Sequence, residues 1–533
     1  MAIRVAFIGA GSIGFTCGLM RDMLCVPELQ DTEFRFTDIS ARNLDMVTQL
    51  ARRDIVYHKL PATILATTNR RKALEGADYV INCTRIGGLE AFKLDIDIPL
   101  KYGIDQCVGD TLCAGGIIYG QRNIPQVLAF CKDMREVSAA KALFINYANP
   151  NAMNTWAAIE HGGVPTIGCC HGVQGAHWQI THVIELWAKT TGRLPKDYVS
   201  PGHEPWNDRR TRMVWGLHRR EVPVIAAGLN HQTWFIKVMF QGEDVTARLP
   251  ELFGKHPVYP KTEKVRIDVL KRFGYFSTES NGHLSEYVAW YRKRPKEIKD
   301  WIEMSSWING ETGGYLRVCI EGRNWFKTDF PNWLKETPQP IGPDHRSEEH
   351  ASSVIEAIHT GRVYRGHLNV RNGSCITNLP PACVVEVPCY VDKTGIHTPI
   401  VGDLPPGCAA VCSASAWVQR LSIEAAVRGE VTLLKQAMLM DPLTGAVCNP
   451  DEISQMTDEL LIAQAEWLPQ YRREIPKAKK RFAAEKRLGT KSVQGAARVR
   501  TQTVADMKRH AAAARANAAA ADKAKMTRKG KRR

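Results

Sequence analysis

The chain has 533 residues, of which 44% are hydrophobic and 24% are charged. This length exceeds one compact core and predicts two domains, and the composition excludes a wholly disordered chain. The net charge of +16 comes from residues 477–533, which hold 19 of the 71 basic residues but only three of the 55 acidic ones. The rest of the chain is balanced in charge, so it has no electrostatic signature of a DNA- or RNA-binding body.

Fifteen cysteines are scattered along the chain without regular spacing. In a chain of this length they predict free thiols in a reducing, cytoplasmic compartment rather than a disulfide framework. The N-terminus enters a glycine turn after eight residues, which is too early for the apolar core of a signal peptide. No apolar run approaches the ~18–20 residues that span a bilayer, so we expect no membrane segment.

The first part of the chain alternates short apolar strands with helical patterns. Strands are predicted at residues 3–8, 33–38, 77–82, 142–146 and 166–170. Helical spacing of apolar residues, as at Phe15, Leu19 and Met23, fills the intervals between them. This alternation predicts an α/β fold, a Rossmann-like, doubly wound parallel sheet over residues 1–200.

After residue 200 the pattern is more mixed. The stretch Pro201–Pro223 is rich in charge and tryptophan and is predicted as a loop or insertion, whereas Cys383–Pro388 is typical of a strand. We therefore expect a C-terminal α/β (α+β) domain over residues 201–476. From residue 477 onward Ala, Lys and Arg dominate. This predicts a disordered, basic, low-complexity tail, which is usually a solvated extension and otherwise a non-specific polyanion contact.

A glycine-rich turn after the first strand predicts a dinucleotide site. The first glycine makes the turn, the second lets the backbone approach a pyrophosphate, and the third allows close helix packing. Asp38 closes the second strand, where an acid binds the ribose hydroxyls and favours NAD over NADP. The alternative is a structural turn with Asp38 as a helix cap. The predicted cofactor-binding residues are Gly9, Gly11, Ser12, Ile13, Gly14 and Asp38.

Cys170 and His171 follow the predicted strand 166–170, and His231 lies in a Gly-Leu-Asn-His segment further along. Ligands of open α/β sheets bind outside the carboxyl ends of the strands, and a thiol with an imidazole could hold a divalent metal there. A packed cysteine and a hydrogen-bonded histidine are the more common uses of such residues. Asn149, at the end of another strand, could bind a sugar hydroxyl or cap the next helix.

Several segments in order resemble glycoside hydrolase family 4, most closely its α-galactosidase (melibiase) branch. They extend over about residues 1–470 and leave the tail outside. The matching segments are Phe7–Ser12, Asp110–Leu112, Asn146–Trp156, Cys170–Gly175, Gly228–His231, Gly274–Ser280, Asn369–Asn372 and Met440–Pro442.

This resemblance implies a lactate/malate-dehydrogenase-like fold and a glycosidase that uses NAD catalytically, an exception to the two-carboxylate scheme. Members oxidise the C3 hydroxyl, remove the C2 proton, eliminate the C1 substituent, add water and reduce C3 again. A divalent metal, usually Mn²⁺, acts as a Lewis acid on the sugar oxygens. The resemblance also implies a homo-oligomer, a dimer or tetramer.

The resemblance assigns roles to individual positions. Cys170 and His231 match the metal ligands, and Asn149 matches a substrate-binding position. His171 matches the place of a general acid, and orienting the metal loop is its alternative role. Glu279 matches a base for the C2 proton, with Tyr287 as its rival and a structural role as the alternative for both. Asn369 and Arg371 match substrate contacts or, equally, a turn after a strand.

One position departs from the α-galactosidase branch, which typically has Cys-His-Ser-Val where this chain has Cys170-His171-Gly172-Val173. Glycine there is typical of α-glucosidase and α-glucuronidase branches, so the same chemistry on α-glucosides or α-uronides remains an alternative. A plain NAD-dependent dehydrogenase and a nucleic-acid-binding protein with an inactive enzyme body are the rival function classes. The intact glycine turn with Cys170 and His231 favours the glycosidase.

Overall fold

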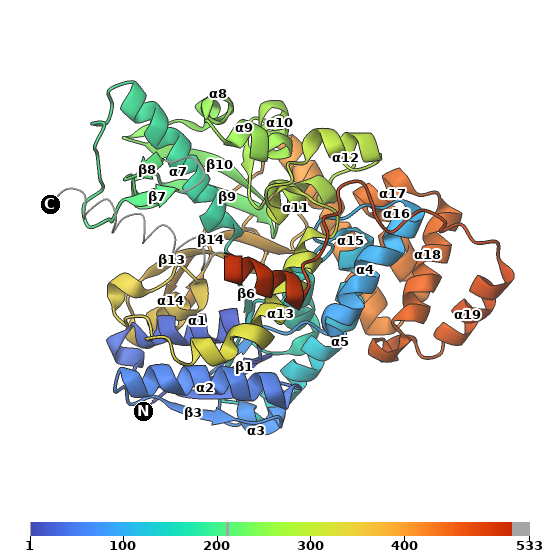
Figure 1. The fold of residues 1–533 in the computed structure, drawn as a ribbon, viewed down its shortest axis with the longest axis horizontal. Helices are drawn as coiled ribbons and strands as arrows, with labels where there is room; N and C mark the ends of the chain where they lie inside the picture. Colours follow the sequence, from blue (N-terminus) through green and yellow to red (C-terminus); the bar gives the residue numbers. More distant parts are fainter. Residues whose placement is uncertain (1, 209–212, 514–533) are drawn as a thin grey trace.

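The computed structural model describes residues 2–208 and 213–513 (Figure 1). Within these ranges, 13 strands form one mixed sheet, whose main path has the order β11-β10-β9-β14-β13-β6-β5-β4-β1-β2-β3, while β12 pairs with β10 and β15 with β14. A separate two-stranded sheet pairs β7 with β8. The strands are β1 Arg4–Ile8, β2 Glu33–Thr37, β3 Thr63–Ala66, β4 Tyr79–Asn82, β5 Leu143–Asn146, β6 Thr166–Gly168, β7 Trp206–Asp208, β8 Met213–Trp215, β9 Val224–Leu229, β10 Gln232–Phe240, β11 Glu243–Asp244, β12 Phe276–Ser277, β13 Tyr364–Arg371, β14 Val384–Asp392 and β15 Gly395–His397.

The strands β3-β2-β1-β4-β5-β6 are parallel, in the order of a dinucleotide-binding sheet. Alternate side chains of β1 enter two different cores. Phe7 packs in the core that contains residues of α1 and α2, and Ala6 and Ile8 pack in the core that contains residues of α5. The predicted doubly wound parallel sheet is confirmed, and the strand β3 is an addition that the apolar pattern did not predict.

Helices cover both faces of the sheet, and the helices of residues 406–484 gather at one side of the molecule (Figure 1). Across the described part of the chain, no helix combines the length and apolar character needed to cross a bilayer. The helices are α1 Ile13–Leu24, α2 Ala41–Tyr57, α3 Arg70–Leu74, α4 Gly88–Tyr102, α5 Cys113–Val137, α6 Asn151–Ala157, α7 Gly172–Thr190, α8 Leu249–Lys255, α9 Tyr259–Thr262, α10 Lys264–Phe273, α11 Asn281–Tyr287, α12 Pro295–Trp301, α13 Gly314–Trp333, α14 His350–Thr360, α15 Pro406–Arg428, α16 Val431–Met440, α17 Pro442–Val447, α18 Pro450–Ala463 and α19 Ile475–Ala484.

The second half of the chain continues the same sheet with antiparallel strands. The pair Asn369 and Gly168 joins β13 to β6, so the sheet crosses the predicted boundary at residue 200 without a break. The strands β9 and β10 form a hairpin whose loop is Asn230–His231, and His231 has a φ of 67° there. This tight turn places the histidine at the end of the hairpin.

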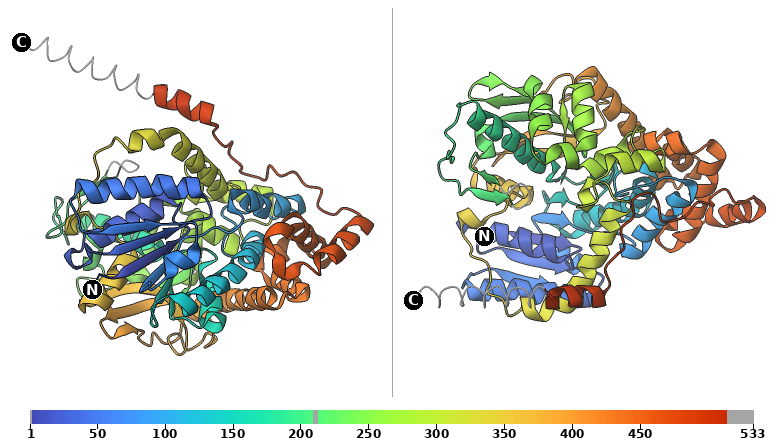
Figure 2. Two further views of the ribbon diagram at one scale, coloured as in Figure 1. Left: turned by 90° about the horizontal axis from the view of Figure 1, so that it is seen from below. Right: turned by 45° about the horizontal axis from the view of Figure 1, so that its top comes forward.

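The insertion and the tail both differ from the sequence expectation. Within Pro201–Pro223, Trp206 of β7 pairs with Trp215 of β8, whereas residues 209–212 lie outside the described residues. The tail forms α19 and then runs over the outside of the body (Figure 2). The residues 514–533, which include most of the alanine-rich patch and the terminal basic cluster, lie outside the described residues.

The predicted disorder of the tail does not hold for residues 477–502, because their backbone finds acceptors on the body. The Ala496 N–H donates to Asp105 Oδ2 at 2.7 Å, and the Gln502 N–H donates to Glu321 Oε1 at 2.8 Å. Arg498 forms an ion pair with Asp97 at 2.8 Å. Composition did not predict this docking, because it depends on backbone donors, on acidic residues of the body and on the packing of Ala497 against Ile298 and Ile302.

Candidate functional site

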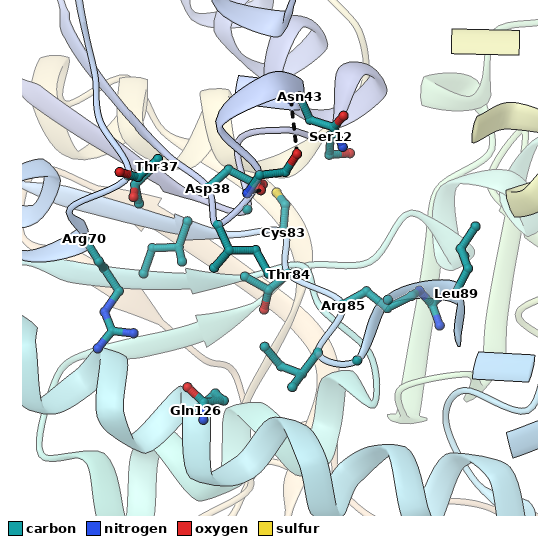
Figure 3. Close-up of a pocket in the computed structure, with 18 of the residues that line it drawn as sticks. Ser12, Thr37, Asp38, Asn43, Arg70, Cys83, Thr84, Arg85, Leu89 and Gln126 are labelled. Atoms are coloured by element: carbon teal, nitrogen blue, oxygen red, sulfur yellow. Dashed lines mark hydrogen bonds between the residues drawn. The ribbon is translucent and has the colours of Figure 1, made fainter. Parts of the chain in front are cut away.

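The glycine turn between β1 and α1 borders a pocket of about 860 Å³ (Figure 3). Gly9 has a φ of +85°, and a Cβ on it would lie 2.9 Å from the carbonyl group of Cys83. A Cβ on Gly11 would lie 2.8 Å from Asp38 Oδ2, which accepts the Gly11 N–H at 2.8 Å. Both positions therefore need glycine, because backbone or a carboxylate occupies the space of a side chain.

The start of α1 faces this pocket. Ile13 is the first residue of α1 and Gly14 the second, and Ser12 is the N-cap, whose side chain makes no capping hydrogen bond. The free N–H groups of this helix end and its dipole favour an anionic ligand such as a pyrophosphate. Gly14 has no atom within 4 Å of the position of a Cβ, so its surroundings would tolerate a side chain.

Asp38 follows β2 directly and lines the same pocket. Its carboxylate is fixed by two backbone donors, Gly11 N–H and Ser40 N–H, each at 2.8 Å. In Figure 3, Asp38 and Thr84 lie between the side chains of Arg70 and Arg85. An oriented acid beside a glycine turn is the arrangement that binds the ribose of NAD, so these residues fit that cofactor.

A second cavity of about 440 Å³ adjoins the first, and both are lined by Ser12, Cys83, Thr84 and Arg85. It lies at the carboxyl ends of β4, β5 and β6, the edge where open α/β sheets bind their ligands. Besides Ser12, five residues predicted for catalysis, substrate binding or metal binding come together in its lining. They are Asn149, Cys170, His171, His231 and Glu279.

Three of these side chains converge in a possible metal cluster, with donor atoms all within 4.8 Å of one another. Cys170 Sγ lies 3.4 Å from His231 Nε2 and 3.4 Å from Glu279 Oε1. Glu279 Oε1 lies 3.6 Å from His231 Nε2. A thiolate, an imidazole and a carboxylate form a donor set that suits a divalent transition metal.

Thr111 determines which nitrogen of His231 can bind a metal. The Thr111 hydroxyl donates its one proton to Asp110 Oδ1 at 2.9 Å and lies 2.8 Å from His231 Nδ1. It must therefore accept the Nδ1–H of His231, because it has no second proton to donate. The Nε2 atom that faces Cys170 then carries a lone pair, as a ligand atom requires.

The ionisation of Cys170 and Glu279 favours one bound cation in the cluster. Burial and the nearby Glu279 carboxylate raise the pKa of the Cys170 thiol well above its usual range. Burial acts against ionisation of Glu279, but His231, His283 and His171 lower its pKa to about 2. The carboxylate is thus ionised at neutral pH, while the thiolate form of Cys170 needs a positive partner such as a metal ion.

His171 stands at the mouth of the cavity as the N-cap of α7, with 67% of its side chain exposed. Its Nδ1 lies 3.4 Å from Glu349 Oε1. The side-chain hydrogen bond with Glu349 raises the pKa of His171 to about 9. The imidazole is therefore protonated at neutral pH and can donate a proton into the cavity.

The lining of the cavity also contains three residues for which the sequence predicted no role, namely Asp110, His283 and Arg85. Asp110, His231 and His283 form a second overlapping donor set, and Asp110 Oδ2 accepts the side-chain amide of Asn149 at 3.0 Å. Arg85 lies against the rings of Phe92, Tyr119 and Tyr315. The sequence indicated Asp110–Leu112 only through the family resemblance. The spacing of His283 and Arg85 does not predict that they line this cavity.

Three predicted residues do not line the cavity. Tyr287 is fully buried, and its hydroxyl lies 3.5 Å from His231 Nδ1, behind the metal cluster. Asn369 is fully buried, with its amide 3.4 Å from Glu386. Arg371 is exposed. Because β13 runs antiparallel to β6, the chain beyond Asn369 heads towards the amino end of β6, away from the ligand-binding edge.

The sequence matches two models of one family over most of its length. "Family 4 glycosyl hydrolase" matches residues 4–186, and "Family 4 glycosyl hydrolase C-terminal domain" matches residues 226–444. The chain belongs to family 4 of the glycosyl hydrolases. The predicted membership is confirmed, and so is the prediction of a glycosidase.

Two curated relatives of this family 4 hydrolase are named alpha-galactosidases. The protein of Rhizobium meliloti (strain 1021) is 51% identical over 519 residues, which cover 97% of this chain and 99% of the relative. The protein of Bacillus subtilis (strain 168) is 32% identical over 477 residues, which cover 88% of this chain and 100% of the relative. The match therefore covers the whole Bacillus protein but leaves part of this chain unmatched.

Solved structures share the fold of this family 4 hydrolase. The 6-phospho-beta-glucosidase of Thermotoga maritima with manganese, NAD⁺ and glucose-6-phosphate has a TM-score of 0.67 at 24% identity, over 87% of this chain and 99% of that one. A 6-phospho-alpha-glucosidase from gut microorganisms with NAD and glucose-6-phosphate has a TM-score of 0.67 at 22% identity, over 88% of this chain and 99% of that one.

Proposed function

We propose that this family 4 hydrolase is an NAD- and Mn²⁺-dependent α-galactosidase. The observation that carries the proposal is the junction of two cavities. The glycine-turn pocket shares Ser12, Cys83, Thr84 and Arg85 with the cavity that contains the Cys170–His231–Glu279 cluster. A dinucleotide and a metal-bound sugar could therefore meet in one site. The two curated relatives named alpha-galactosidases support the choice of sugar.

When bound, NAD would supply reversible oxidation at C3 of the sugar, and the metal would supply Lewis-acid polarisation of the C2 and C3 oxygens. Cys170 and His231 hold the metal. Asn149, fixed by Asp110, binds a sugar hydroxyl. Gly9, Gly11, Ser12, Ile13, Gly14 and Asp38 hold NAD.

The protein's own proton transfers fall to two residues. His171, protonated beside Glu349, donates a proton to the leaving oxygen at C1. Glu279, ionised and lining the cavity, accepts the C2 proton. Tyr287 is less suited to this role, because its hydroxyl is buried against His231, and we assign it to positioning that ring. Asn369 is assigned to support of the sheet beneath the site, and Arg371 receives no role.

One set of assays tests this proposal. The protein is incubated with NAD, Mn²⁺ and a reductant on p-nitrophenyl α-galactoside, α-glucoside, α-glucuronide and α-galacturonide. We expect release from the galactoside that needs NAD and is abolished by Cys170→Ser. Release without NAD, or at full rate in the Cys170→Ser variant, refutes the mechanism. Preference for another glycoside keeps the mechanism but corrects the sugar.

The elimination step has its own readout. Removal of the C2 proton by Glu279 predicts that hydrolysis in D₂O places deuterium at C2 of the released sugar. A product without deuterium at C2 contradicts the step. The Glu279→Gln variant should lose this exchange while it still binds Mn²⁺, and a loss of metal binding would instead identify Glu279 as a ligand.

We also propose that the protein is a cytoplasmic homo-oligomer, a dimer or tetramer. All 15 cysteines are free, which suits a reducing compartment, and large apolar side chains are exposed on α15 and α16, including Trp417 and Met440. Light scattering after gel filtration tests the assembly, and a monomer contradicts it.

The basic tail is proposed to contact polyanions non-specifically, with an affinity that falls steeply with salt and is lost when residues 477–533 are removed.

A further inference from the structure

A third cavity of about 690 Å³ lies between α7, the β7–β8 strands and α9. Figure 1 shows α7 beside β7 and β8. Aromatic rings dominate the lining, with Trp178, Trp206, Trp215 and Tyr259 among them. We call this cavity the aromatic pocket. It shares no lining residue with the cavity of the metal cluster.

One face of α7 connects the two cavities. His171 lines the metal cavity, whereas Gly175, Trp178 and His182 line the aromatic pocket. These residues follow each other at intervals of three or four, so they lie on one side of the helix. From His171 to His182 this side extends roughly 16 Å. Gly175 is exposed, and a Cβ on it would meet no atom within 4 Å, so the surface between the cavities is open.

Aromatic rings in the aromatic pocket stack on one another with nearly parallel planes. The His182 ring stacks with both Trp206 and Trp215, with centroids at 5.5 and 4.5 Å and interplanar angles of 17° and 15°. The side chain of Trp206 is nevertheless 52% exposed. Stacking fixes these rings without ligand, so a binding partner would meet a rigid aromatic surface at little entropic cost.

Polar groups of the aromatic pocket suit a ligand rich in hydroxyl groups. Gln179 donates to Glu263 at 3.2 Å, and Arg266 lies behind both and pairs with Glu263 at 3.1 Å. The described lining also contains the acid Asp208 and the amides of Gln179 and Asn207. Two buried polar atoms, His182 Nε2 and Trp215 Nε1, have no hydrogen-bond partner among the described residues. Buried polar groups without partners indicate that a ligand or water completes the site.

We propose that the aromatic pocket binds the distal sugars of the leaving group of α-galactosyl oligosaccharides. This inference rests on the proposed function. A general acid at His171 must face the leaving oxygen, so the leaving group extends from the metal cavity over the start of α7. The open surface at Gly175 then leads it to a pocket of aromatic faces and unpartnered ring N–H groups, the combination that packs against and hydrogen-bonds a sugar ring.

Two substitutions test the pocket. Trp206→Ala removes an aromatic face, and Gly175→Phe fills the open surface between the cavities without changing the β7–β8 strands. Gly254→Phe is the matched control, because Gly254 is also an exposed helical glycine with no atom within 4 Å of a Cβ, and it lines none of the three cavities. Circular dichroism melting confirms that each variant is folded.

Activity is measured on p-nitrophenyl α-galactoside and on the trisaccharide raffinose, with NAD, Mn²⁺ and a reductant. We expect kcat/KM on raffinose to fall about five- to tenfold in Trp206→Ala and Gly175→Phe, the scale of one lost aromatic contact. The kcat/KM of both variants on the p-nitrophenyl substrate should equal that of the parent protein. The Gly254→Phe variant should keep the parental kcat/KM on both substrates. Equal losses on both substrates, or no loss on raffinose, overturn the proposal.

A binding measurement separates failure of the pocket from failure of the proposed function. Sucrose, the leaving group of raffinose, is titrated against the tryptophan fluorescence of the holoenzyme. A saturable change that disappears in Trp206→Ala supports the pocket, and a flat titration in the parent protein overturns it. If the parent protein cleaves neither galactoside, the α-galactosidase proposal fails, and the sucrose titration alone decides whether the pocket binds saccharides.

Discussion

Gly172 and Glu279 compete for one space at the start of α7. A Cβ on Gly172 would lie 1.7 Å from Glu279 Oε1 and 2.7 Å from its Cδ. Glu279 itself has a φ of 69°, in the left-handed region that non-glycine residues rarely adopt. The glycine at position 172 therefore has a steric reason, since it leaves room for the carboxylate beside Cys170.

A side chain at position 172 should displace that carboxylate. We predict that Gly172→Ser lowers kcat/KM on the cleaved glycoside about 100-fold, the scale of a misplacement of about 1 Å in an active site. The rate is measured at saturating NAD and Mn²⁺. Gly254→Ala is the control, because that helical glycine has open space around it. A Gly172→Ser enzyme with the parental rate would show that Glu279 needs no such room.

The pair of His171 and Glu349 predicts the alkaline limit of activity. Glu349 raises the pKa of His171 to about 9, so a general acid at His171 stays protonated through neutral pH and is lost above about pH 9. Glu349→Gln should move the alkaline limb of the kcat/KM profile to lower pH, by about one unit because water screens the exposed ring. An unshifted limb argues against His171 as the acid.

The same pair has a stability consequence of defined sign. The folded-state pKa of His171 is raised above its ordinary value of 6.5. The stabilisation from the pair is therefore fully present below about pH 6.5 and is lost as the pH rises through about 9. The melting temperature of Glu349→Gln should differ from that of the parent at pH 6 and converge with it at pH 10. A constant difference would contradict the linkage.

Thr111 should matter for metal binding although it is not a ligand. Thr111→Val removes the acceptor for the His231 Nδ1–H, so the ring can adopt the wrong tautomer. We predict a 10- to 100-fold weaker affinity for Mn²⁺, the usual effect of losing such an outer hydrogen bond, measured by calorimetry. Thr48→Val is the control, because Thr48 is a buried threonine that bonds Leu44 within α2. Equal affinities in the two variants would contradict the prediction.

Asp38 should determine the choice of dinucleotide. Its carboxylate faces the pocket and would repel a 2′-phosphate. Asp38→Asn keeps an oxygen that can accept the Gly11 N–H but removes the charge. We expect the preference for NAD over NADP to fall at least about tenfold, from the Kd values of the two cofactors. An unchanged preference would show that another group excludes the phosphate.

The docked part of the tail should stabilise the loop that carries Asp110 and Thr111. Asp105 lies in this loop, accepts the Ala496 N–H and pairs with Arg292. A chain ending at residue 485 removes the Ala496 donor from Asp105 and leaves Thr312 and Arg292 as its partners, and we predict a melting temperature several degrees lower. A chain ending at residue 513 keeps every described contact and should melt with the parent. Identical melting of both truncations would contradict the role.

The sequence by itself determined the parts of this protein that local order encodes. The first two parallel strands, the glycine turn and the acid after β2 follow one another within about 40 residues, and each has its own pattern of apolar, glycine or acidic residues. Cys170 and His231 were identified by resemblance rather than by spacing, since 60 residues separate them.

Only the tertiary structure decided which distant side chains share a site. The joining of β13 to β6 and the β9–β10 hairpin bring His231 to Cys170, whereas the antiparallel direction of β13 takes Arg371 away. Asp110, His283 and Arg85 enter the cavity through loops and helix starts whose local sequence has no periodic signal. Contacts of this kind depend on how the elements pack in space, and the order of residues along one element does not record them.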